Sequence, residues 1–151
     1  MNASKLVAAM AQVTCSDSLC GECQACCVTL YIDGPDFDPP KPSHQPCRHC
    51  SANGCCLHKS RRYPQVCRTF ECWWLASQTT DEPMPPEMRP DRSGVILTGP
   101  EPGEPDDLFY VHPDITDQDA CDRDPVRGFL RRVQAEGLRA RLVTHYHGEV
   151  L

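Results

Sequence analysis

Cysteine dominates the sequence between residues 20 and 72. The chain of 151 residues holds twelve cysteines, and ten of them fall within this stretch. Only 40% of residues are hydrophobic and 7% aromatic, and there are 15 prolines. Such a composition makes a large aliphatic core hard to assemble. We therefore expect the cysteines to help hold the fold together.

The redox compartment decides what these thiols do. An even number of cysteines can form disulfides in a secreted protein, whereas in a reducing cytosol they more often bind metal. The N-terminal stretch MNASKLVAAMAQVTC has too short an apolar run for an ordinary signal peptide. We therefore expect a cytoplasmic protein with reduced thiols. A disulfide-stapled secreted domain stays open as an alternative.

Charge and hydropathy argue against two classes of partner. The formal charge is -6 and the isoelectric point is near 5.4, whereas a nucleic-acid surface needs a basic face. The sequence has no apolar run long enough to span a membrane. We expect a metal ion as the partner, with no nucleic acid and no membrane.

The first cysteine cluster, CGECQACC at residues 20–27, allows two arrangements. If it is helical, all four sulfurs lie on one face, because successive side chains advance by about 100°. If it is a knuckle of tight turns, Cys20 and Cys23 clip one metal, and the doublet Cys26 and Cys27 diverges toward different sites. Both arrangements remain open at this stage.

The second cluster, residues 47–72, supplies thiols in similar spacings. It contains a second C-x2-C, a second doublet and two later cysteines: Cys47, Cys50, Cys55, Cys56, Cys67 and Cys72. Basic residues stand between them: Arg48, Lys59, Arg61, Arg62 and Arg68. These cations would offset the negative charge of a thiolate centre, or they form an ordinary solvated face.

The segments CGECQACC, GCCLHKSRRYPQVCRTFECWWL and MPPEMRPDRSGVIL together resemble the CxxCxxCC family of cysteine-cluster proteins, also called YkgJ-like. The likeness covers roughly residues 20–97, and the family is described as zinc- or iron-chelating. The ligands that the resemblance implies are Cys20, Cys23, Cys26, Cys27, Cys47, Cys56, Cys67 and Cys72. Cys50 and Cys55 are additional to the pattern, so either member of the 55–56 doublet could be the ligand.

The expected function is therefore metal binding through an eight-cysteine cluster, with Zn²⁺ first and iron or an iron–sulfur cluster second. A related branch contains flagellin lysine N-methylases, which implies an iron–sulfur-dependent protein-modifying enzyme as an alternative. No G-x-G-x-x-G loop for a nucleotide cofactor follows any predicted strand, which argues against an enzyme. No catalytic residue is assigned. Because the apolar core is thin, we expect metal binding to be coupled to folding.

Several histidines, both tryptophans and two cysteines lie outside this pattern. Three histidines beside the clusters could replace a sulfur, although each is more often a surface residue: His44, His49 and His58. Two more, His145 and His147, alternate on a predicted strand and so share a face. We expect Trp73 and Trp74 to cover the metal centre. Cys15 and Cys121 should be free thiols.

The predicted fold is a small single α+β domain over residues 1–151. Its cysteine-cluster region is 20–75 and its α+β remainder is 93–151. Within the remainder, 93–100 and 107–113 read as a β-hairpin, and 138–147 as a strand. A helix starts after Asp124 as N-cap, with Pro125 at its first position, and stops at Gly137. The proline-rich segments 33–46 and 81–90 read as loops.

Overall fold

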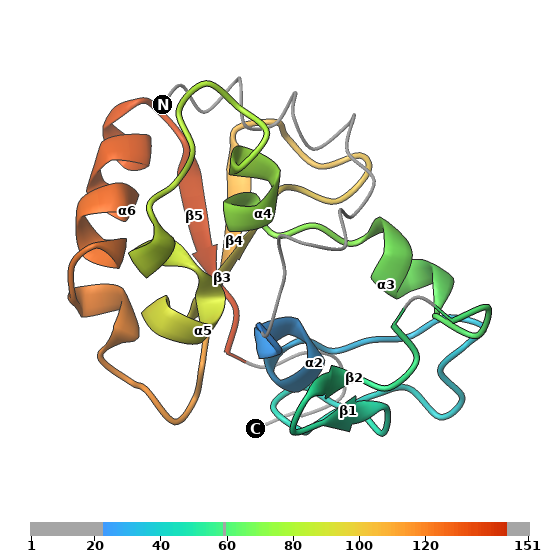
Figure 1. Ribbon diagram of the computed structural model, residues 1–151. Helices are drawn as coiled ribbons and strands as arrows, with labels where there is room; N and C mark the ends of the chain where they lie inside the picture. The colour runs from blue at the N-terminus through green and yellow to red at the C-terminus, as the bar shows by residue number, and fades with distance from the viewer. Residues whose placement is uncertain (1–22, 59, 145–151) are drawn as a thin grey trace.

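The computed structural model describes residues 23–58 and 60–144 (Figure 1). The prediction of an α+β fold is confirmed, since helices and two antiparallel or mixed sheets occur together. The helices are α2 (Ala25–Thr29), α3 (Gln65–Thr69), α4 (Trp73–Ser77), α5 (Pro90–Ser93) and α6 (Val126–Ala135), with 3-10 turns η1 (Pro86–Met88) and η2 (Ala120–Asp122). The strands are β1 (Cys50–Ser51), β2 (Gly54–Cys55), β3 (Val95–Thr98), β4 (Leu108–Pro113) and β5 (Arg139–Leu142).

The larger sheet has the strand order β3-β4-β5. The predicted hairpin is confirmed, because β3 and β4 pair antiparallel with Leu97 opposite Val111. Strand β5 pairs with β4 in the parallel direction, with Phe109 opposite Ala140. A parallel pair needs a crossover, and α6 lies in that connection.

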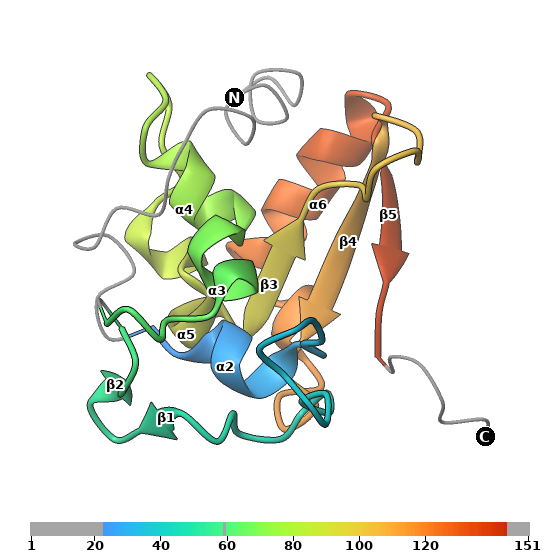
Figure 2. The same ribbon diagram turned by 90° about the vertical axis from the view of Figure 1, so that its right-hand side faces the viewer.

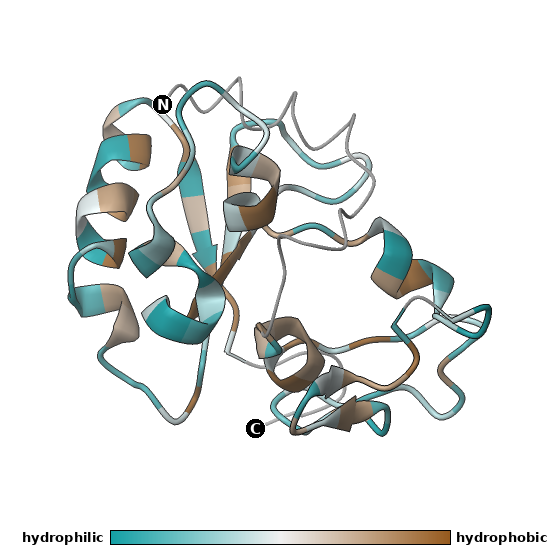
Figure 3. Ribbon diagram, in the orientation of Figure 1, coloured by the Kyte–Doolittle hydropathy of each residue, from teal (hydrophilic) through white to brown (hydrophobic). Residues whose placement is uncertain are grey.

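One face of this sheet carries the main core. Side chains alternate along a strand, so Phe109 and Val111 enter the core while Tyr110 and His112 face the other way. Helix α6 adds Phe129 from its apolar side, visible as the brown inner stripe in Figure 3. The remaining core members come from α4, η1, β3, η2, α6 and the loop between α4 and η1: Trp73, Met84, Met88, Val95, Leu97, Ala120, Val126 and Val133.

The C-terminal helix and strand lie close to their predicted positions. Helix α6 begins one residue later than predicted, because Pro125 is its N-cap and Val126 its first helical residue. Asp124 still serves this end, since its Oδ1 accepts a hydrogen bond from the amide of Gly128 at 3.2 Å. The predicted C-terminal strand is confirmed over residues 139–142, and His145 and His147 lie outside the described residues.

The cysteine half lies at the end of the sheet where β4 finishes (Figure 2). It consists of α2, the two-stranded ribbon β1–β2, α3 and the connecting loops. The predicted turn at 51–54 is confirmed as the tip of this ribbon. The proline-rich loop folds back on α2, since Ile32 and Lys41 form an isolated antiparallel bridge. No helix in the described ranges is long and apolar enough to cross a membrane.

Candidate metal centre

Helix α2 presents the cysteine doublet to the interior of the cysteine half. Cys26 and Cys27 both lie in this five-residue helix, whereas Cys23 stands before its first residue. The sulfurs of Cys26 and Cys27 interact by a hydrogen bond, and Cys27 also interacts with Cys50. The doublet is therefore helical, but Cys23 does not share its sulfur face.

Six cysteines from four chain segments gather here, and we call them the thiol group: Cys26, Cys27, Cys47, Cys50, Cys55 and Cys67. The charges of Cys27 and Cys47 each act to raise the pKa of Cys67. The same two residues raise the pKa of Cys55. Thiols that influence one another in this way lie close together in space. The structure thus brings cysteines of both sequence clusters near one another.

The ribbon β1–β2 separates the second doublet. Cys50 and Cys55 are direct cross-strand partners, so their side chains stand on the same face. Cys56 follows in the turn after β2. Its side chain is exposed, and its amide donates to the carbonyl of His49 at 2.8 Å. The structure therefore brings Cys55 into the thiol group and leaves Cys56 outside.

Burial and crowding raise the pKa of three members of the thiol group: Cys50, Cys55 and Cys67. Desolvation is the main cause that raises the pKa of Cys67 to about 12, with the neighbouring cysteines adding to it. The pKa of Cys27 shifts in the other direction. The hydrogen bond from Cys26 lowers it to about 7, although burial acts to raise it. Ionising the whole group would need a cation that neutralises the thiolates.

Lys41 is the cation already at this site, and it was not predicted from the sequence. Its side chain is 5% exposed and donates to the carbonyls of Val28 at 3.0 Å, Leu30 and Pro42 at 2.7 Å. Burial lowers its pKa, while the nearby cysteines, Cys47 first, act to raise it. A lysine in a proline-rich loop has no sequence signal for this role, since only the folded loop brings it over α2.

A second, separate pair is formed by Cys23 and Cys72, which interact with each other. Cys23 accepts hydrogen bonds from the amides of Ala25 and Asp91. Cys72 lies at the start of α4 and accepts from its first amides, but burial dominates and raises its pKa to about 11. Six of the eight cysteines implied by the resemblance thus divide between two places, and Cys56 lies outside both. Cys20, the remaining member, lies outside the described residues.

Two of the arginines expected to offset thiolate charge, Arg48 and Arg68, instead hold loops. Arg68 donates to the carbonyls of Tyr63 at 2.8 Å and Ser60 at 3.1 Å, and its guanidinium lies over the Tyr63 ring. Arg48 donates to the carbonyl of Asp36 at 3.1 Å and covers the ring of Phe37. Lys59 is outside the described residues.

The tryptophan prediction was wrong. Trp73 is fully buried in the core beneath the sheet, where it stacks on Phe109 with ring centroids 4.9 Å apart. Trp74 packs against the same core and donates its Nε1 to the carbonyl of Pro85. Helix α4 faces the sheet rather than the thiol group, so these rings stabilise the hydrophobic half.

The three nearby histidines have other contacts. His44 pairs its Nε2 with the carbonyl of Thr144 at 3.0 Å, and His58 stands edge-on to Tyr63. His49 donates its amide to the sulfur of Cys47 at 3.4 Å. Across residues 23–58 and 60–144, no three Cys, His, Asp or Glu side chains already stand in the geometry of a bound ion. Cys121 is free and packs beside the core, and Cys15 is not described.

Glu71 is a further residue that sequence reasoning missed. It is 6% exposed, and neither carboxylate oxygen has a hydrogen-bond partner among the described residues. Burial raises its pKa, so the protonated carboxyl is favoured over the charge. Its position between Cys67 and Cys72 places it on the segment that joins the two groups of thiols.

We compared the chain with known proteins in three ways. Models of protein families, curated proteins and solved structures give no match. The likeness to the CxxCxxCC family therefore depends on the motifs in the sequence and stays a prediction.

Proposed function

We propose that this protein binds a metal ion through the thiol group, with zinc as the first candidate. The observation that carries the proposal is the convergence of six cysteines from α2, the loop after it, the β1–β2 ribbon and α3. Cysteines gathered this densely are typical of zinc or iron–sulfur centres.

The donor set fits such an ion chemically. All members are sulfur ligands, which suit Zn²⁺, copper(I) and iron–sulfur clusters better than hard cations. Desolvation and the neighbouring thiols raise the pKa of Cys50, Cys55 and Cys67, and a bound cation would replace their protons. The side chains are near but not yet in ligand geometry, so the ion would draw them together. Ordering of the cysteine half would then accompany binding.

We prefer four thiols as ligands: Cys27, Cys47, Cys55 and Cys67. The charges of Cys27 and Cys47 act on the pKa of both Cys55 and Cys67, and the charge of Cys55 acts on that of Cys67. Cys50 stands directly across from Cys55 and is the nearest substitute. Cys55 replaces Cys56 of the motif-based set, since the side chain of Cys56 points to solvent. Cys23 and Cys72 would belong to a second site rather than to this one.

The other two functional alternatives gain less support. An iron–sulfur cluster uses the same sulfur donors and stays the second candidate for the centre, while no feature of the described residues favours a methylase. All ten cysteines that the structure describes are free, so a disulfide-stapled domain has no cross-link among them. A reducing compartment, the cytoplasm, is the setting in which such thiols stay available.

Elemental analysis and a visible spectrum of anaerobically purified protein test the proposal. We expect about one zinc per chain and no visible colour for a closed tetrathiolate site. Iron with sulfide and absorption in the visible range would replace zinc by a cluster. Cys121→Ser is the matched control, and it should keep the metal. If a double variant, Cys27→Ser with Cys67→Ser, holds as much metal as this control, the thiol group is not the site.

A further inference from the structure

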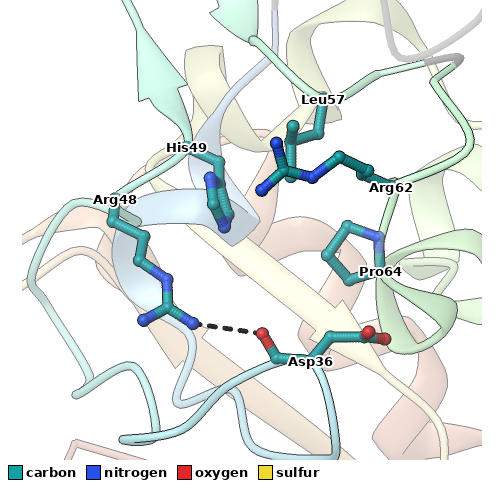
Figure 4. A pocket seen from close by; sticks show the side chains of 6 residues that line it. All are labelled: Asp36, Arg48, His49, Leu57, Arg62 and Pro64. Atoms are coloured by element: carbon teal, nitrogen blue, oxygen red, sulfur yellow. Dashed lines mark hydrogen bonds between the residues drawn. The ribbon is translucent and has the colours of Figure 1, made fainter.

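A cavity of about 400 Å³ opens on the outer side of the cysteine half (Figure 4). Its lining comes from three separated segments: Asp36, Arg48, His49, Leu57, Arg62 and Pro64. The volume falls within the range of ligand-binding pockets in proteins. Since none of these side chains belongs to the thiol group, the cavity is a different feature from the candidate metal centre.

Two arginines give the cavity a positive charge. Asp36 is the one carboxylate among the lining residues, so the formal balance of Arg48, Arg62 and Asp36 is +1. The carboxylate is partly engaged, because its Oδ2 accepts the amide of Gln65 at 3.0 Å. This local excess stands out in a chain whose formal charge is -6. An anion in the cavity would therefore be attracted rather than repelled.

The two guanidinium groups differ in how they are held. Arg48 is fixed, because it donates to the backbone carbonyls of Asp36 and Asp38 and lies 5.7 Å from the centre of the Phe37 ring. Arg62 extends over the cavity toward His49 (Figure 4). Within the described part of the chain, the guanidinium of Arg62 makes no hydrogen bond or ion pair. One arginine is thus pre-positioned and the other has its donors available.

The rest of the lining limits the size and character of a ligand. Leu57 and Pro64 offer an apolar wall, and the His49 ring is held edge-on to Phe37 at 6.3 Å. A guanidinium presents a planar fork of N–H donors that matches the paired oxygens of phosphate or carboxylate. The combination favours a small oxyanion whose oxygens meet the arginines.

We propose that this cavity, the oxyanion pocket, binds a small oxyanion, with inorganic phosphate or a carboxylate as the chemical class. Arg62 supplies the principal contact, and Arg48 supplies a second positive charge on the same space. The lining residues are outside the thiol group, and anion binding is measured separately from metal content.

Isothermal titration calorimetry of the purified full chain with inorganic phosphate tests whether the oxyanion pocket binds an anion. The ionic strength is held constant with chloride. A parallel titration with succinate distinguishes phosphate from carboxylate. We expect saturable binding of one anion per chain. Arg62→Gln should weaken it about tenfold or more, as the loss of a charge-assisted hydrogen bond implies. Arg62→Lys keeps the charge but loses the fork, so it should restore only part of the affinity.

Arg61→Gln is the matched control. Arg61 is the exposed neighbour of Arg62, it does not line the cavity, and the variant changes the net charge equally. It should bind within about twofold of the wild type. Equal weakening by the two glutamine variants would show diffuse attraction to a basic surface and overturn the proposal. So would the absence of saturation by either anion below about 10 mM. Circular dichroism confirms that each variant is folded, and metal content measured on the same samples tests the proposed function separately.

Discussion

The ring of Trp73 stacks on the ring of Phe109, with centroids 4.9 Å apart and planes inclined by 24°. Trp73 directly follows Cys72, whose partner is Cys23 of the cysteine half. The stack therefore stands at the point where the chain passes from the thiols into the hydrophobic core. Its contribution to stability can be separated from that of the thiols.

Truncation of Trp73 should be severe. Trp73→Ala removes a fully buried ring, and we expect the free energy of unfolding to fall by about 3–5 kcal/mol. Urea denaturation, monitored by circular dichroism, measures this free energy. If the alanine variant does not fold, Trp73→Phe replaces it in the comparison. Trp74→Ala is the control, because that side chain is only partly buried and should cost less. Equal losses for the two alanine variants would contradict the core position of Trp73.

Lys41 should matter for the cysteine half. Lys41→Met leaves the carbonyls of Val28, Leu30 and Pro42 without their donor, so we expect a loss of about 3 kcal/mol or more in unfolding free energy. Arg92→Met removes an equal charge from an exposed position and is the control. Thermal melts compare the two. A Lys41→Met variant that melts with the control would show that the buried ammonium has no structural role.

The second doublet offers a pair of neighbouring residues with opposite predictions. Cys55→Ser should lower the zinc content, because Cys55 belongs to the thiol group. Cys56→Ser should leave it unchanged, because Cys56 is exposed. Metal analysis of both variants, purified side by side, checks this. The reverse outcome would favour the motif-based ligand set over the one drawn from the structure.

Removal of the metal should act on one half of the molecule. The main core belongs to the sheet half, whereas the cysteine half buries few apolar side chains. After treatment with a strong chelator, the amides of Ile32 and Lys41 should lose protection from hydrogen exchange, and that of Val111 should keep it. Exchange measured by NMR distinguishes this from global unfolding. Simultaneous loss at all three would mean that the sheet half also depends on the ion.

Protonation of His112 should make the stability of the protein depend on pH. Burial first, and then the charge of His44, lowers the pKa of His112 from 6.5 to about 4 in the folded state. The unfolded chain therefore binds a proton more readily, so stability is complete above pH 6.5 and declines as the pH falls toward 4. The loss should approach about 3 kcal/mol.

Urea midpoints between pH 7 and pH 4 measure this effect. His112→Gln should flatten the decline, since the glutamine does not titrate, whereas the control His58→Gln should keep the wild-type slope. A slope that is the same in all three proteins would show that His112 does not carry the pH dependence.

The secondary structure of the sheet half could largely be predicted from the sequence, because it depends on residue patterns within each segment. Alternating or continuous apolar residues in 93–100 and 107–113 predicted the hairpin, and apolar spacing from Val126 to Val133 predicted α6. The parallel pairing of β5 with β4 was not predicted. It depends on how α6 packs back on the sheet, which is a property of the whole half.

The cysteine half was predicted in composition but not in arrangement. The spacing of cysteines indicated that two clusters converge, yet it did not separate Cys23 and Cys72 from the thiol group. Helices α2, α3 and α4 have five residues each, too few for a hydrophobic period to show. The positions of Lys41 and Arg62 depend on loop conformation, for which no repeating pattern exists.

The direct succession of Cys72 and Trp73 has a practical consequence. The chain contains two tryptophans, which follow this cysteine as residues 73 and 74. A change of ligation or oxidation at Cys72 thus occurs one peptide bond away from the dominant natural fluorophore. The protein carries its own optical reporter, so occupancy at Cys23 and Cys72 can be followed by emission intensity without any label.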